Sequence, residues 1–201
     1  MFAALQAYQS RQNIMNFCSQ CGAPVHVRIP EGDNLPRYVC TVCATIHYQN
    51  PKIVAGCIPE WQGRVLLCRR AIEPRYGLWT LPAGFMENGE TTPVAAARET
   101  LEEANAVVKN LELYGVFNLP HINQVYMLFR GRLHEGQASA GAETLEVQLC
   151  EEAQVPWDEL AFPVIRETLE LFFEDRRRGV YPVRMGDIIR GADNRIEVRR
   201  Y

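Results

Sequence analysis

Three glutamates stand close together in the middle of the chain, at Glu99, Glu102 and Glu103. In a helix, a rotation of about 100° per residue gathers their carboxylates on one face, with apolar side chains roughly opposite, at Val94, Ala97, Leu101 and Ala104. Like charges at these spacings destabilise a helix by about 0.2–0.5 kcal/mol per pair, so helix stability does not explain the grouping. Oxygen ligands at this density suit Mg²⁺ or Mn²⁺, which complete their shells with water and substrate phosphates. The alternative is a solvated acidic face.

A second metal site is indicated by two CxxC units, formed by Cys18 with Cys21 and by Cys40 with Cys43. In a chain without a secretory signal, paired CxxC units predict a structural Zn²⁺ ribbon in which four thiolates close a tetrahedron. Such a closed site stabilises a fold and does not catalyse. A thioredoxin-like redox pair is the alternative, but it gives no role to the second unit. The remaining cysteines lie in apolar runs and receive no functional role: Cys57, Cys68 and Cys150.

The glutamates belong to a longer pattern with fixed intervals: Gly84, five residues, Glu90, seven residues, Arg98-Glu99, two residues, Glu102-Glu103. Here the sequence resembles the Nudix hydrolases, whose box reads G, five residues, E, seven residues, R-E-U-x-E-E-x-G-U, where U is aliphatic. All six of these charged or glycine positions match. Three others depart, at Thr100, Asn105 and Ala106. Asparagine follows glycine as a left-handed helix cap and Thr100 points toward the packed side, so we expect the departures to affect packing rather than chemistry.

The resemblance implies an α/β sandwich, a Nudix fold with a mixed sheet between helices and the box as loop, helix and loop. It also implies divalent-metal-dependent hydrolysis of a nucleoside diphosphate linked to another group. By position, the Mg²⁺ or Mn²⁺ ligands are Glu99, Glu102 and Glu103, joined by the carbonyl of Gly84. Arg98 and Glu90 are implied to orient the helix. A further catalytic carboxylate is expected from a late strand, with Glu146 preferred to Glu143.

A zinc ribbon in front of the box narrows the resemblance to two groups. The NADH pyrophosphatases carry S-Q-P-W-P-F-P after the box, and this chain instead has LYGVFNLPHINQVYMLFRG. The other group contains plant plastid FAD and ADP-ribose pyrophosphatases and their bacterial relatives, and it is similar in CTVCATIHYQNPKIVAGC and GLWTLPAGFMENGE. The resemblance therefore implies a substrate of the FAD, ADP-ribose or NADH type, cleaved to AMP and the other phosphate half.

Substrate-binding residues are expected on both sides of the box. Arginine forks could clamp phosphates in bidentate fashion, and three of them precede the box: Arg69, Arg70 and Arg75. Aromatic rings could stack on an adenine or flavin, although rings in strand-rich segments more often pack in a core. The candidates for stacking are Tyr76, Trp79, Phe117 and Tyr126.

The elements that must position these residues follow from apolar periodicity and turn residues. A hairpin of strands 52–60 and 64–70 turns at Gln62-Gly63, and both faces of its first strand are apolar, which predicts a place inside a covered sheet. Thr92 and Pro93 begin a helix over 93–104. Further strands are predicted at 107–117, 123–133 and 144–150, and a second helix at 162–178.

This pattern divides the chain into four parts. Residues 1–15 are expected to be an N-terminal extension, 16–49 the zinc ribbon and 50–179 the Nudix domain. The tail 180–201 alternates in polarity, and an extra hairpin, an oligomer contact and disorder all remain open for it. A homodimer is compatible with the sequence.

Composition narrows the class of protein and its partners. With 47% hydrophobic and 22% charged residues among 201, the chain is neither disordered nor a coiled coil. It has no apolar run of about 20 residues and no secretory signal, so we expect a cytoplasmic protein without a membrane partner. The net charge is −3, and the only fixed positive charges in the ribbon are Arg28 and Arg37. We therefore expect a small-molecule nucleotide as the partner, and not nucleic acid. The alternative function is a nucleotide-sensing Nudix protein whose ribbon contacts nucleic acid or a partner.

Overall fold

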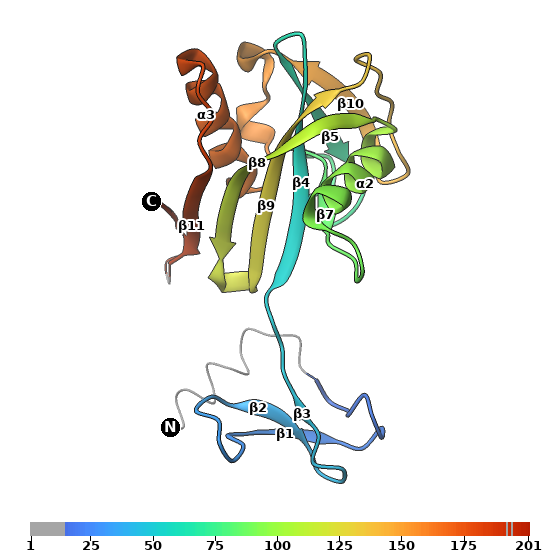
Figure 1. The fold of residues 1–201 in the computed structure, drawn as a ribbon, viewed down its shortest axis with the longest axis vertical. Helices are drawn as coiled ribbons and strands as arrows, with labels where there is room; N and C mark the ends of the chain where they lie inside the picture. Colours follow the sequence, from blue (N-terminus) through green and yellow to red (C-terminus); the bar gives the residue numbers. More distant parts are fainter. Residues whose placement is uncertain (1–14, 192, 194) are drawn as a thin grey trace. The chain divides into compact units, whose positions relative to one another are not determined.

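The chain divides between Pro51 and Lys52 into two units (Figure 1), in a computed structural model that describes residues 15–191, 193 and 195–201. Most of the expected N-terminal extension lies outside these residues. The first unit is an antiparallel sheet in the order β1-β2-β3, with β1 at Val25–Arg28, β2 at Arg37–Cys40 and β3 at Ile46–His47. Few apolar side chains are buried in it, among them Tyr38 and Val39. A unit this small needs another source of stability.

The second unit is built on a mixed sheet, which confirms the predicted fold class. Its order is β10-β5-β4-β9-β8-β11-β12, with β6 beside β5 and β7 beside β4. β4 runs parallel to β9 and β8 runs parallel to β11, and the other pairs along this path are antiparallel. The strands are β4 Lys52–Trp61, β5 Arg64–Arg70, β6 Trp79–Thr80, β7 Ala83–Phe85, β8 Val108–Leu119, β9 Gln124–Leu133, β10 Thr144–Cys150, β11 Arg184–Arg190 and β12 Ile196–Arg200.

Two α-helices cover this sheet, α2 at Thr92–Ala104 and α3 at Pro163–Arg178 (Figure 1). Three short 3-10 helices complete the described elements, at Pro120–Ile122, Glu152–Gln154 and Trp157–Glu159. Alternate residues of β4 pack in different clusters: Val54 and Ile58 with the side chains of α3, Ala55 and Cys57 with those of α2. Successive strand residues point to opposite faces, so the two helices lie on opposite faces of the sheet, as the doubly apolar strand predicted.

The packed face of α2 agrees with the predicted one at the buried Ala104 and the partly buried Ala97, but differs from it elsewhere. Val94 and Leu101, expected in the core, are 54% and 51% exposed, whereas Ala95 and Ala96 are fully buried. Short alanine side chains let the helix approach the sheet closely, so the buried face is turned toward the glutamates rather than away from them. The predicted separation of a packing face from a carboxylate face is therefore wrong.

Helix and hairpin ends follow local chemistry. α2 ends at Asn105, which adopts the predicted left-handed conformation with φ 45° and ψ 36°. It begins one residue earlier than predicted, with Thr91 at the N-cap. Gln62 and Gly63 both have positive φ, the geometry of a tight hairpin turn.

The tail belongs to the sheet, and of the three open alternatives for it the structure has the hairpin. β11 pairs with β8, and β12 pairs with β11. β11 is also tied to α3, because the buried carboxylate of Asp175 accepts hydrogen bonds from Arg184 and from the hydroxyl of Tyr114, the latter at 2.8 Å. Among the described residues, no helix has the length and apolar character needed to cross a membrane.

Candidate active site

The box begins on β7, whose backbone lies directly against α2. Gly84 of β7 pairs with Ala55 of β4. A Cβ atom built on Gly84 would lie only 2.3–2.4 Å from the carboxylate atoms of Glu99. Any side chain at position 84 would therefore displace this carboxylate. Close approach of the Glu99 carboxylate, and not a special backbone conformation, favours glycine at this position.

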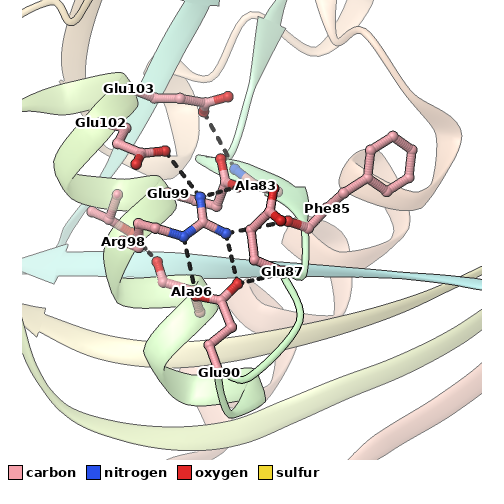
Figure 2. Close-up of polar contacts among 10 residues, drawn as sticks. Ala83, Phe85, Glu87, Glu90, Ala96, Arg98, Glu99, Glu102 and Glu103 are labelled. Carbon is pink, nitrogen blue, oxygen red and sulfur yellow. Dashed lines mark hydrogen bonds and ion pairs between the residues drawn. The ribbon is translucent and has the colours of Figure 1, made fainter.

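The guanidinium of Arg98 binds several acceptors around it (Figure 2). It donates to both oxygens of Glu90, at 2.7 and 3.1 Å, and to the carbonyl of Phe85 at 3.2 Å. Its third nitrogen donates to Glu99 at 2.8 Å and to Glu102 at 2.9 Å. One side chain thus connects the loop of the box with two of the three glutamates on α2.

The contact between Arg98 and Glu90 is the strongest of these by geometry, because it is bidentate and charge-assisted. Glu90 also accepts a hydrogen bond from the backbone N–H of Glu87 at 2.6 Å, which closes the loop on itself. These bonds, led by the one from Arg98, lower the pKa of Glu90, and the same contact raises the pKa of Arg98. Both groups are held in their charged forms.

Glu99 and Glu103 are buried carboxylates, each 8% exposed. Burial, followed by the nearby charge of Glu99, raises the pKa of Glu103 to about 8, although the N–H of Ala83 donates to it at 3.3 Å. Burial also raises the pKa of Glu99. Burial disfavours the charged forms of these two carboxylates and so destabilises the fold, and carboxylates whose pKa is raised in this way gather at functional sites.

The donor set fits a hard divalent cation. It consists of three carboxylates and the backbone of Gly84 beside them, and oxygen donors of this type are those that Mg²⁺ and Mn²⁺ prefer. Within the described part of the chain the carboxylates do not converge into one tight cluster, because Glu99 and Glu102 turn toward Arg98. The positive charge of Arg98 therefore offsets part of the repulsion among these carboxylates, a role that a bound cation would share.

A further carboxylate is brought near this cluster by the loop before β10. After burial, the charge of Glu143 is among the influences that raise the pKa values of Glu99 and Glu103. Glu146 instead lies opposite Arg69 on β5, with an oxygen–nitrogen distance of 3.7 Å. The irregular register between Thr144 and Glu146 separates the two glutamates in a way that spacing alone did not show.

The three candidate arginines differ in their contacts. The charge of Arg70 opposes the rise in the pKa of Glu103, so it acts on the cluster. Arg69 donates to the carbonyl of Gly77 at 2.8 Å in addition to its contact with Glu146. Arg75 is exposed, in a loop where its φ is 71°. Their role in binding phosphate stays a prediction.

The predicted stacking residues are mostly core residues. Phe117 is fully buried and Trp79 is 5% exposed, both in the cluster that packs under α3, so the prediction that they stack on a substrate is wrong for these two. Tyr126 is also buried, at 8% exposed, and burial raises its pKa. An exposed ring that the prediction missed belongs to Phe85, next to Gly84, with Lys52 over it at 4.8 Å.

The cysteine sulfurs gather as the zinc ribbon requires. The Sγ atoms of Cys18, Cys21, Cys40 and Cys43 all lie within 4.8 Å of one another. Hydrogen bonds led by the side chain of Thr45 lower the pKa of Cys43 to about 6, which favours the thiolate. Nε2 of the buried His47 lies 3.3 Å from the sulfur of Cys18. Four thiolates with supporting hydrogen bonds fit a Zn²⁺ ion.

A cleft of about 1200 Å³ lies away from the box. It is formed around the turn between β4 and β5 and by the neighbouring ends of β8 and β9, and its lining includes Glu60, Trp61, Lys109, Arg130, Arg132 and His134. No residue of the box lines it. The candidate active site is therefore identified by buried carboxylates with raised pKa values, and not by the volume of a cleft.

Comparison with family models agrees with this geometry. A model described as Nudix N-terminal, a zinc ribbon, matches residues 16–49, and a NUDIX domain model matches residues 50–172, more than half of the chain. The chain belongs to the Nudix hydrolase family. Among solved structures, this Nudix chain is similar to the crystal structure of a NUDIX hydrolase from Nitrosomonas europaea, with 58% identity, a TM-score of 0.84, and coverage of 87% of this chain and 99% of that one.

The curated relatives of this chain include proteins named NAD-capped RNA hydrolase NudC. The Vibrio vulnificus protein is 32% identical over 139 residues, which cover 68% of this chain and 50% of that protein. The Chromobacterium violaceum protein is 38% identical over 112 residues, which cover 54% of this chain and 40% of that protein. The chain spans half or less of the length of these relatives.

Zinc binding and folding of the first unit should be coupled, because four thiolates organise a segment with little core of its own. We expect one zinc per chain to copurify, and Cys40→Ser to lose it. Elemental analysis of untagged protein measures this, with Cys150→Ala, a buried cysteine of the second unit, as the control that keeps its zinc. Protein without zinc, in which Cys18 and Cys21 form a disulfide, would show that the ribbon assignment is wrong.

Glu103 should make the protein less stable as pH rises when no divalent cation is added. An unfolded glutamate loses its proton near 4.5, whereas folded Glu103 keeps it to about 8, so the unfolded state binds fewer protons in this window. The free energy of unfolding therefore falls between these pH values. Glu103→Gln should remove this part of the decline and be more stable than the parent near pH 8.

Urea unfolding at pH 5 and pH 8, with zinc left in the ribbon and no Mg²⁺ or Mn²⁺, measures the difference. Glu112→Gln, at a side chain 74% exposed, is the matched control and should follow the parent protein. Equal pH dependence in the parent and in Glu103→Gln would contradict the buried, protonated state of Glu103.

Proposed function

We propose that this chain is a divalent-metal-dependent Nudix pyrophosphatase that hydrolyses nucleoside diphosphate derivatives to AMP and the other phosphate half. The observation that carries the proposal is the pair of buried carboxylates, Glu99 and Glu103, whose pKa values are raised beside the exposed Glu102. A fold tolerates such a grouping when a cation is part of its working state. All box carboxylates are present, which supports an enzyme over a nucleotide sensor.

In this proposal Glu99, Glu102 and Glu103 hold Mg²⁺ or Mn²⁺, with the carbonyl of Gly84 as a further ligand. Bound there, the cation supplies charge neutralisation of the diphosphate and a lowered pKa for the attacking water. Glu90 acts through Arg98, since their bidentate contact fixes the loop of the box to α2. Glu143 and Glu146 are the candidates for the remaining carboxylate, and Glu143 is favoured because its charge acts on the cluster.

Substrate recognition outside the diphosphate falls to residues around the box. Arg70 is the proposed phosphate-binding residue, and the action of its charge on Glu103 supports this role. Phe85 offers an exposed ring, and a nucleobase is a planar partner for such a ring. Arg69, Arg75 and Tyr126 remain proposed contacts.

The substrate class rests on two kinds of support. The missing NADH signature favours FAD or ADP-ribose. The name of the NudC relatives instead favours a diphosphate of the NAD type, including one at the end of an RNA. These compounds share an adenosine diphosphate. The name of these relatives speaks against the expectation that nucleic acid is not a partner, so we include an RNA capped with NAD among the proposed substrates. A cytoplasmic location and a homodimer remain proposals.

We expect AMP release from at least one of FAD, ADP-ribose, NADH and an RNA capped with NAD, in the presence of Mg²⁺ or Mn²⁺. Hydrolysis in ¹⁸O-water, followed by mass spectrometry, should place the label in AMP or in the partner phosphate, because water attacks phosphorus. Glu103→Gln controls for the metal site and should turn over about 10²-fold more slowly, the loss typical of a preorganised charged group.

Two results would overturn parts of this assignment. Turnover confined to nucleoside triphosphates would remove the proposed substrate class. Tight binding of the dinucleotides without any turnover would favour the sensor.

A further inference from the structure

The C-terminal end of α2 is covered by the loop that leads to β10. The N–H of Ser139 donates to the carbonyl of Ala104 at 2.8 Å, and the N–H of Gly141 donates to the carbonyl of Glu103 at 3.0 Å. The last carbonyls of a helix have no partner within the helix. The loop supplies these partners, so it is docked on the turn that carries Glu102 and Glu103.

Gly141 shows how close this docking is. A Cβ atom built there would lie 1.8 Å from the carbonyl oxygen of Glu102. A separation this short leaves space only for glycine. The backbones of the loop and of the helix are therefore in direct contact behind the box carboxylates.

Asn105 fastens the loop with its side chain. Its Nδ2 donates to the carbonyl of Ala140 at 3.0 Å, to the hydroxyl of Ser139 at 3.1 Å and to the carbonyl of Ser139 at 3.4 Å. The Nudix box has glycine at this position. Glycine would end the helix equally well, because it adopts the left-handed conformation freely. Glycine has no amide, and the contacts with the loop would be lost.

The loop carries Glu143 two residues after Gly141. The carbonyl of Glu143 accepts a hydrogen bond from the N–H of Ala71 at 2.8 Å, and the N–H of the buried Thr144 donates to the carbonyl of Gly141 at 3.2 Å. Glu143 is thus held between the end of β5 and the docked loop, two residues after the glycine whose N–H donates to the carbonyl of Glu103.

We propose that Asn105 is a positioning residue of the active site: its amide fixes the segment 139–141 on the end of α2 and so holds Glu143 beside the carboxylates of the box. This inference rests on the proposed function, in which those carboxylates bind a divalent cation. Asn105, Ser139 and Ala140 are all exposed, so the contacts add little to the core. Their effect is on the place of the loop.

Asn105→Gly tests the proposal without straining the backbone. We expect faster hydrogen exchange in 139–143 and an affinity for Mn²⁺ weaker by about threefold to tenfold, the scale of one lost hydrogen-bonded contact. Mn²⁺ titration by calorimetry measures the affinity without any substrate. Asn110→Gly is the matched control, since Asn110 is exposed and also left-handed, with φ 55°.

The variant Glu143→Gln distinguishes an effect of Asn105 through Glu143 from a general loosening of the loop. If Asn105 acts through Glu143, adding Asn105→Gly to Glu143→Gln should change the Mn²⁺ affinity no further. An equal loss in both backgrounds, unchanged exchange in 139–143, or a parent protein that binds no Mn²⁺ would overturn the proposal. Mn²⁺ binding with the expected pattern but no hydrolysis of any diphosphate would leave this inference standing and remove the proposed function.

Discussion

Repulsion among the neighbouring carboxylates of α2 constrains how the box of the second unit is built. Glu99 and Glu103 are buried with raised pKa values, and Arg98 offsets the charge by binding Glu90, Glu99 and Glu102 at once. The guanidinium contacts the loop as well as the helix, so the hydrogen bonds that offset the carboxylate charge also hold the box in its fold. The glycine at position 84 belongs to this arrangement, since the carboxylate of Glu99 occupies the space of its missing side chain.

Local signals predicted much of the fold. The strands and helices lie close to their predicted bounds, because turn residues and apolar runs act over a few residues. The packed face of α2 could not be predicted by separating polar from apolar residues. Glu99 and Glu103 are buried, and the helix approaches the sheet through Ala95 and Ala96, so Val94 and Leu101 are left outside. Conflicts between a local rule and the fold are expected at functional sites.

The candidate site could likewise be predicted only in part. The box and the cysteines were predictable, because each is a short motif with fixed intervals. Contacts from distant segments were not. Phe117 and Trp79 are aromatic, but burial in the sheet's core is decided by register and not by type. Glu146 follows an irregular register in β10, and Glu143 lies in a loop that contacts Asn105, neither of which spacing reveals.

Anomalous scattering from crystals grown with Mn²⁺ would show whether the box carboxylates bind a divalent cation, since it locates the metal without reference to turnover. We expect manganese density bounded by Glu99, Glu102, Glu103 and Gly84, with Glu99 and Glu102 turned from Arg98 toward the ion, and a separate zinc signal at the four cysteines. Zinc density in the ribbon with no manganese at the box, and Arg98 still bound to Glu99 and Glu102, would contradict this expectation.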